Sequence, residues 1–151
     1  MEGKINVKYK LLAITDEHCF SKFDDQDLTG LNGGTLKFQY KINTIIKMSE
    51  DAILVIPGVK FSFADKVVFE ESAVFNYSIP NLDGIVVVDK ENQRINVKAD
   101  IFPSLIGTAY NSLRGIVYMR TIGTPLAAYP VPMIEVNTLV EKNGISVSEG
   151  A

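Results

Sequence analysis

The sequence predicts an α+β fold: a four-stranded antiparallel sheet with a long crossover after strand 1, then a long C-terminal helix, a proline-bearing linker and a short final helix. Over the first 80 residues apolar and polar residues alternate, which is typical of strands with one solvated face. From Phe102 to Val117 the apolar residues recur every three or four positions, which is the spacing of a helix face. The 151 residues suffice for one core, so we expect one domain over 1–140 and a disordered tail over 141–151.

The first strand is predicted over residues 4–13. Ile5, Val7, Tyr9, Leu11 and Ala13 alternate there with lysines and an asparagine. The segment 16–35 that follows contains acidic residues at 24–27 and turn-forming residues at 30–34, so we expect it to be the crossover.

Three more strands are predicted over 36–42, 52–63 and 67–79, and together with the first they are expected to form a meander. The third run contains Pro57 and Gly58. Because proline cannot donate to a strand ladder, this pair predicts a bulge or an edge position. Residues 83–98 hold two short apolar runs around a polar turn, which predicts an added hairpin of unknown role.

The long helix is predicted from Pro103 to Thr121, since proline is tolerated in a first helical turn. Residues 122–125, Ile-Gly-Thr-Pro, end it. Small side chains form rows on this helix at four-residue spacing, and such rows allow a second element to approach closely. We therefore expect an oligomer interface on the helix, formed by Gly107, Asn111, Gly115, Leu113 and Val117.

Composition excludes several classes of protein. The net charge is −3 and the 15 basic residues are scattered, which argues against a nucleic-acid partner. No apolar run has the length of a membrane span, and the charged N-terminal residues do not fit a signal peptide, so we expect a cytoplasmic protein without membrane insertion. A single cysteine, Cys19, fits a reducing compartment.

No residue group carries the pattern of an enzyme site, and we expect neither enzyme activity, nor a cofactor, nor a metal. His18 and Cys19 are adjacent, so in an extended segment their side chains point to opposite faces and cannot form a nucleophile–base pair. The acidic residues at 24–27 and 70–71 are interpreted as solvated charge. Gly33 and Gly34 lack the helix and the lysine of a phosphate loop.

Aromatic residues offer a different kind of site. Eight Phe and six Tyr are concentrated in the crossover and the later strands, and a small sheet covered on one face leaves some of them near the surface. Apolar grooves floored by a sheet bind extended peptides. The residues we expect to bind peptide are Phe20, Phe23, Leu31, Phe61, Phe75 and Tyr77.

Several segments resemble the SecB-type export chaperone family. Arg114 on the helix, Gly123-Thr124 at the turn and Pro132 in the linker are spaced as in the C-terminal part of that family. Glu135 to Leu139 is similar to the start of the family's final helix, and 11–15 followed by 20–23 is similar to its first strand and exit. The resemblance spans residues 7 to 140, although Ile122 stands where the family's turn has arginine.

The resemblance implies an ATP-independent holdase that binds unfolded polypeptides, including preproteins for export, as a homotetramer built as a dimer of dimers. The translocation motor ATPase is the family's further partner. Two alternatives stay open: a SecB-like chaperone dedicated to an antitoxin, and a small-ligand-binding or enzymatic α+β domain. The sequence names neither the client nor the pathway.

Overall fold

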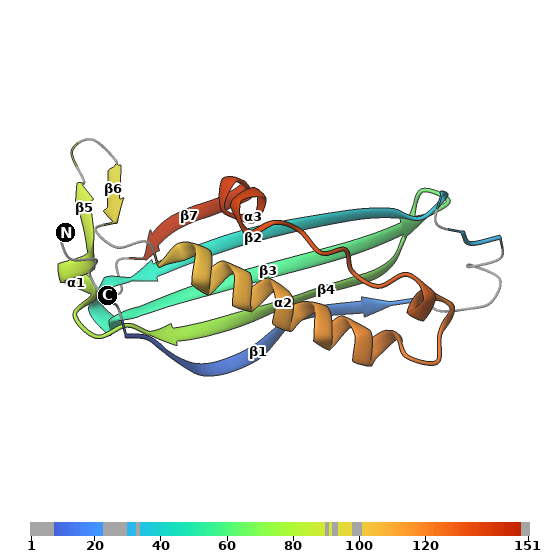
Figure 1. Ribbon diagram of the computed structural model, residues 1–151, viewed down its shortest axis with the longest axis horizontal. Coiled ribbons are helices and arrows are strands. Elements are labelled where there is room, and N and C mark those ends of the chain that lie inside the picture. The colour runs from blue at the N-terminus through green and yellow to red at the C-terminus, as the bar shows by residue number, and fades with distance from the viewer. Residues whose placement is uncertain are drawn as a thin grey trace.

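A computed structural model describes residues 8–22, 30–32, 34–89, 91, 94–97 and 101–148. It shows an α+β fold in which a mostly antiparallel five-stranded sheet carries a long helix on one face (Figure 1). The α+β class, the mainly antiparallel sheet and the long helix expected from the sequence are thereby confirmed. The number of strands in the sheet is five rather than four.

The sheet has the strand order β1-β4-β3-β2-β7. Its strands are β1 (Lys10–Ser21), β2 (Lys37–Lys47), β3 (Ala52–Phe63), β4 (Lys66–Ser78) and β7 (Asn143–Ser148). The pairs β1–β4, β3–β4 and β2–β3 are antiparallel, whereas β7 runs parallel to β2. β2, β3 and β4 form a meander.

The place of β1 differs from the expected four-stranded meander. β1 lies at the opposite side of the meander from β2, so it pairs with β4 and not with β2. Alternation along a strand indicates which of its side chains share a face, but it carries no information on which strand lies beside it. β1 extends to Ser21, so the crossover expected over 16–35 is wrong for residues 16–21, and residues 23–29 and 33 lie outside the described residues. The pairing of β1 could not be predicted.

The C-terminal segment also differs from the expectation. Residues 143–148 form β7, so the disordered tail predicted over 141–151 is wrong for the described residues 141–148, and residues 149–151 lie outside them. In β7 Ile145 and Val147 alternate with serines, and Val147 packs against the core. The strand pairs with β2 through backbone hydrogen bonds, and Thr44 Oγ1 donates to Asn143 Oδ1 at 2.7 Å. Two alternating apolar residues are too short a pattern to predict a strand.

Pro57 lies in a central strand, so the predicted edge position is wrong. β3 keeps continuous register with β2 through the pair Ile42 and Pro57. On the β4 side the register is the same before and after Pro57, and the irregularity of that ladder lies between Phe61 and Ser62. No bulge therefore forms at Pro57-Gly58.

The expected hairpin over 83–98 is confirmed in its described part. A short helix, α1 (Leu82–Ile85), leads into β5 (Val86–Asp89), which pairs antiparallel with β6 (Arg94–Val97). Leu82, Ile85 and Val86 are buried. This unit therefore adds to the core at one end of the sheet (Figure 1).

Helix α2 (Phe102–Thr121) lies across the sheet and forms the second layer of the core (Figure 1). Its apolar stripe is buried against alternate residues of the three central strands. Both periodicities read from the sequence thus meet at one interface. The largest fully buried side chains of the two layers include Leu105, Ile106, Tyr110, Leu113, Ile42, Ile53, Phe69 and Phe75.

After α2 the chain turns back along the helix. Gly123 has φ +82°, a conformation that favours glycine and ends the helical run. A short 3-10 helix, η2 (Pro125–Ala128), and an extended linker lead to α3 (Val136–Lys142). Tyr110 Oη donates to Pro132 O at 2.8 Å, and Arg114 Nε donates to Val131 O at 3.0 Å, so α2 holds the linker along its length.

Candidate functional site

β1 is an exposed edge of the sheet. Among the described residues it pairs with β4 alone, so one side of its backbone has no strand partner. All of its 12 residues are exposed. An exposed strand of this length is a template on which another chain can pair by backbone hydrogen bonds.

Apolar side chains are concentrated at this edge. Of the eleven large hydrophobic residues that are exposed in the described part of the chain, five lie on β1 or directly before it. Their exposed fractions are 38% for Tyr9, 41% for Leu11, 56% for Leu12, 47% for Ile14 and 41% for Phe20. Edge strands of soluble proteins are normally protected by charges, so an apolar free edge points to a binding surface.

The two faces of β1 both contribute to this surface. Leu11 and Ile14 stand opposite Tyr77 and Phe75, on the face that α2 covers. Phe20 stands opposite Glu70, on the other face. Register shifts between Leu11 and Ala13 and between Asp16 and His18 locally change the ladder, as bulges do.

Helix α2 holds β1 in place at two points. Near the start of the strand, the hydroxyl groups of Tyr9 and Ser104 share a hydrogen bond. Further along, Arg120 donates from Nη2 to Asp16 Oδ2 at 2.7 Å and from Nε to Glu71 Oε1 at 2.9 Å. The Glu71 side chain on β4 is fully buried, so this guanidinium joins the helix end to both strands.

The Arg120 cluster does not activate Cys19. Although the residue as a whole is exposed, partial desolvation of the Cys19 thiol first, and then the neighbouring Glu71 carboxylate, raise its pKa to about 11, while Arg120 opposes this shift. A thiol of that pKa is a poor nucleophile at neutral pH. His18 points to the opposite face, where its Nε2 lies 3.9 Å from Glu70 Oε2, as the strand alternation predicted.

The predicted peptide-binding residues are distributed over very different environments. Phe20 is exposed on β1, and Leu31 is half-buried against the core. Phe61, Phe75 and Tyr77 are buried between the sheet and α2, with exposed fractions of 3%, 0% and 2%. The chain's own helix therefore occupies the surface that these three were expected to offer to a client. Phe23 lies outside the described residues.

The predicted interface residues are divided in the same way. Leu113 and Val117 are buried in the chain's own core and are not available to a second subunit. Gly107 is also buried, and a Cβ atom there would lie 3.2 Å from Cγ2 of Val136, so its small size serves the contact between α2 and α3. Asn111 and Gly115 are exposed, and nothing lies within 4 Å of a Cβ placed on Gly115.

Sequence reasoning missed a second apolar stripe on α2. Met119 and Ile122 are exposed by 68% and 54%, and Ile116 is half-buried beside them. They follow one another at three-residue spacing: Ile116 and Met119 lie beside Gly115 on the flank of α2, and Ile122 directly follows the helix. The signal was present in the sequence, but the stripe that packs on the sheet is longer and dominated the periodicity.

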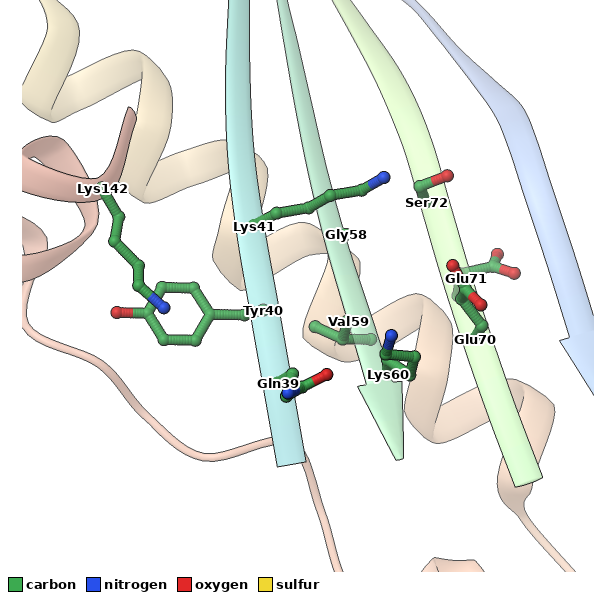
Figure 2. Close-up of a pocket in the computed structure, with 10 residues that line it drawn as sticks. All are labelled: Gln39, Tyr40, Lys41, Gly58, Val59, Lys60, Glu70, Glu71, Ser72 and Lys142. Carbon is green, nitrogen blue, oxygen red and sulfur yellow. The ribbon is translucent and has the colours of Figure 1, made fainter. Parts of the chain in front are cut away.

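The face of the sheet opposite α2, hereafter the open face, has a hollow of about 270 Å³. By register, Lys41, Gly58, Ser72 and His18 form one row across the four antiparallel strands. The next row consists of Gln39, Lys60, Glu70 and Phe20. Figure 2 shows the Lys41 side chain extending across β3 at Gly58 toward Ser72.

Neither metal chemistry nor a membrane span is indicated by the described residues. No group of three or more His, Cys, Asp and Glu side chains among them is placed to hold a metal ion. No helix in the described ranges is both long and apolar enough to cross a membrane.

No protein-family model matches the sequence, and no characterised protein matches it significantly.

Proposed function

We propose that this protein binds unfolded polypeptides as an ATP-independent holdase of the SecB type. The observation that carries the proposal is the free edge of β1, with its five exposed apolar side chains. The succession of four strands, a long helix, a proline-bearing linker and a short helix supports it, because the SecB resemblance implies the same succession. β7 and the β5–β6 hairpin are additions to that plan.

The mechanism follows from the chemistry of an edge strand. An extended client segment pairs with the backbone of β1 through hydrogen bonds that are independent of its sequence. Its apolar side chains then lose water against Leu11, Leu12 and Ile14, at about 2.5 kcal/mol per 100 Å² before ordering costs are subtracted. Bound segments are withdrawn from folding and aggregation by mass action, and the cycle needs no nucleotide.

We propose that the active form is a homotetramer of 16.7 kDa protomers. Asn111 and Gly115 of the predicted interface lie on the exposed side of α2, next to the stripe of Ile116, Met119 and Ile122. A second α2 helix packed there removes this apolar stripe from water, and Gly115 permits a close approach.

Export and antitoxin control are alternative uses of the same holdase. In the SecB family, an acidic sheet face takes part in docking on the translocation motor. The open face of this chain carries lysines at 37, 41, 47 and 60, so that mode of docking receives no support from its charge. Identifying the proteins that co-purify with this chain would distinguish preprotein clients from an antitoxin client.

An aggregation assay tests the holdase proposal. The protein is mixed with a chemically denatured client without nucleotide, and light scattering is followed. We expect suppression by the wild type and its loss when Leu12→Asp and Ile14→Lys are combined. Val87→Lys with Met133→Asp is the matched control, since both of these exposed apolar residues lie away from β1.

The native mass of each variant is measured beside its activity. If the β1 variant remains folded and of wild-type mass but still protects the client fully, the edge is not the client site. If the β1 variant loses wild-type mass, a second copy of the chain occupies the edge, and the client site must be sought elsewhere.

A further inference from the structure

The open face has a charge opposite to that of the whole protein. Strand register places five lysines on this face. Among the described residues the same rows contain one carboxylate, that of Glu70. Glu17 lies at a register shift of β1, so register does not assign it to either face. The full chain has a net charge of −3. These lysines are Lys10 at the end of β1, Lys37, Lys41 and Lys47 on β2, and Lys60 on β3.

Two of these lysines surround the hollow. Lys41 and Lys60 form no ion pair with the described residues, whereas Lys37 lies 3.9 Å from Asp65 and Lys47 lies 3.4 Å from Glu50. A Cβ atom on residue 58 would lie 3.0 Å from Cε of Lys41 and 3.4 Å from Cβ of Ser72. The glycine thus makes room for Lys41 to lie flat across β3 (Figure 2).

An apolar strip continues the open face beyond the hollow. Ile56 and Val74 belong to the row next to Gly58 and Ser72, and Ile45 and Leu54 belong to the row after that. All four side chains are half-buried, and no helix of the described residues covers them. The open face therefore combines a basic hollow and an apolar strip within three neighbouring rows.

We propose that the open face docks an acidic polypeptide segment of a partner protein. A carboxylate of that segment lies over Gly58 between the ammonium groups of Lys41 and Lys60, and its apolar side chains cover the strip of Ile56 and Val74. Ser72 and Gln39 supply neutral hydrogen-bonding groups at the same hollow. Glu70, on the side toward His18, confines the bound carboxylate to the Lys41 side.

A nucleic acid is the competing partner for a basic surface, and the open face does not fit it well. Single strands are held by successive aromatic platforms, whereas the described rows of this face contain Phe20 alone and the hollow adds one half-buried ring, Tyr40. The negative charge of the whole chain opposes a polyanion as long as a nucleic acid. A short acidic segment can bind the lysines of the open face without approaching the acidic residues elsewhere on the protein.

The hollow between Lys41 and Lys60 lies over β2 and β3, whereas the client edge is β1, so this inference goes beyond the proposed holdase function. It is tested by fluorescence anisotropy on the full chain. The probe is a fluorescein-labelled peptide of four glutamates followed by three leucines, compared with its lysine counterpart and with a labelled single-stranded oligonucleotide of equal charge. The variant is Lys41→Gln with Lys60→Gln, and the control is Lys8→Gln with Lys66→Gln, which removes equal charge elsewhere.

We expect the acidic peptide to bind the wild type and the control alike. Loss of two charge pairs should weaken its binding to the Lys41→Gln, Lys60→Gln variant roughly five- to thirtyfold, and added salt should reduce the difference. Equal affinity of variant and wild type, no binding of the peptide, or tighter binding of the oligonucleotide would each overturn the inference. Suppression of client aggregation by the same variant should stay at the wild-type level, which separates this result from the holdase test.

Discussion

Arg120 is the point at which a single substitution should most disturb the attachment of α2 to the sheet. Its guanidinium contacts Glu71, whose side chain is fully buried, and Asp16, whose side chain is 56% exposed. Substitution Arg120→Met keeps most of the aliphatic stem and removes the charge. A carboxylate then remains buried beneath the helix without its cation, with Oε2 already lacking a hydrogen-bond partner among the described residues.

The expected cost follows from the geometry. Breaking a buried pair by removing one partner costs about 3–5 kcal/mol. The Arg120 side chain is 38% exposed, so water reaches the site when it is removed, and we expect about 2–3 kcal/mol for Arg120→Met. Glu71→Gln keeps an acceptor for Nε and leaves Arg120 with Asp16, so it should cost only about 1 kcal/mol.

The double variant, Glu71→Gln with Arg120→Met, distinguishes this mechanism from lost packing. Because it contains no buried charge, it should be more stable than Arg120→Met alone, with a coupling of roughly 1–2 kcal/mol. Asp16→Asn, which alters only the exposed pair, should cost no more than about 1 kcal/mol.

Urea unfolding at one fixed protomer concentration measures all four variants, because stability of an oligomer depends on concentration. The m-values should agree, so that midpoint shifts report stability. The reasoning would be refuted if Arg120→Met were no less stable than Asp16→Asn. It would also be refuted if the double variant were less stable than Arg120→Met.

Three further predictions concern the glycines of α2 and Cys19. Gly107→Leu should destabilise the folded protomer in urea by roughly 1–3 kcal/mol, since the new side chain collides with Val136. Gly115→Leu should not destabilise the protomer, because its side chain meets open space and leucine favours a helix, but it should lower the native mass. The reverse pattern would contradict the packing of α2. At pH 8 Cys19 should react with iodoacetamide about 100-fold more slowly than an ordinary cysteine, because its thiol pKa is raised to about 11. Glu71→Gln should speed the reaction, since the Glu71 carboxylate contributes to this shift. An unchanged rate in Glu71→Gln would contradict this. Because folding raises this pKa above its usual 9.0, the contribution of Cys19 to stability is present below pH 9 and is lost as the pH rises toward 11; relative to Cys19→Ser, the wild type should therefore lose stability over that interval.

The sequence was sufficient to predict the elements whose side chains face a core. β3 over 52–63 and α2 from about residue 102 to 121 lie where the apolar periodicity placed them, because burial on one face requires that periodicity. β7 could not be found in this way, since it is held by ladder hydrogen bonds and by Asn143. The second half of β1 was missed for a related reason: every residue there is exposed, so no alternation marks it.

The candidate site was less accessible from sequence than the fold. Phe61, Phe75 and Tyr77 have the composition of a peptide groove, but the same composition makes a good core, and α2 buries them. Only the strand order shows that β1 has a single strand partner among the described residues and that its Leu11 and Ile14 stay exposed. The lysines of the open face are likewise scattered in sequence, and the register brings them into neighbouring rows.

The chain covers one long edge of this sheet with a strand of its own and adds no described strand at the other, and this difference supports a binding role for β1. On the β2 side the chain adds a short parallel strand, β7, which pairs with the backbone of residues 42–47. On the β1 side no described strand is added, yet that edge bears the apolar side chains. A sheet that covers one long edge with its own strand and leaves an edge with exposed apolar side chains unpaired has the arrangement expected where a second chain is to pair.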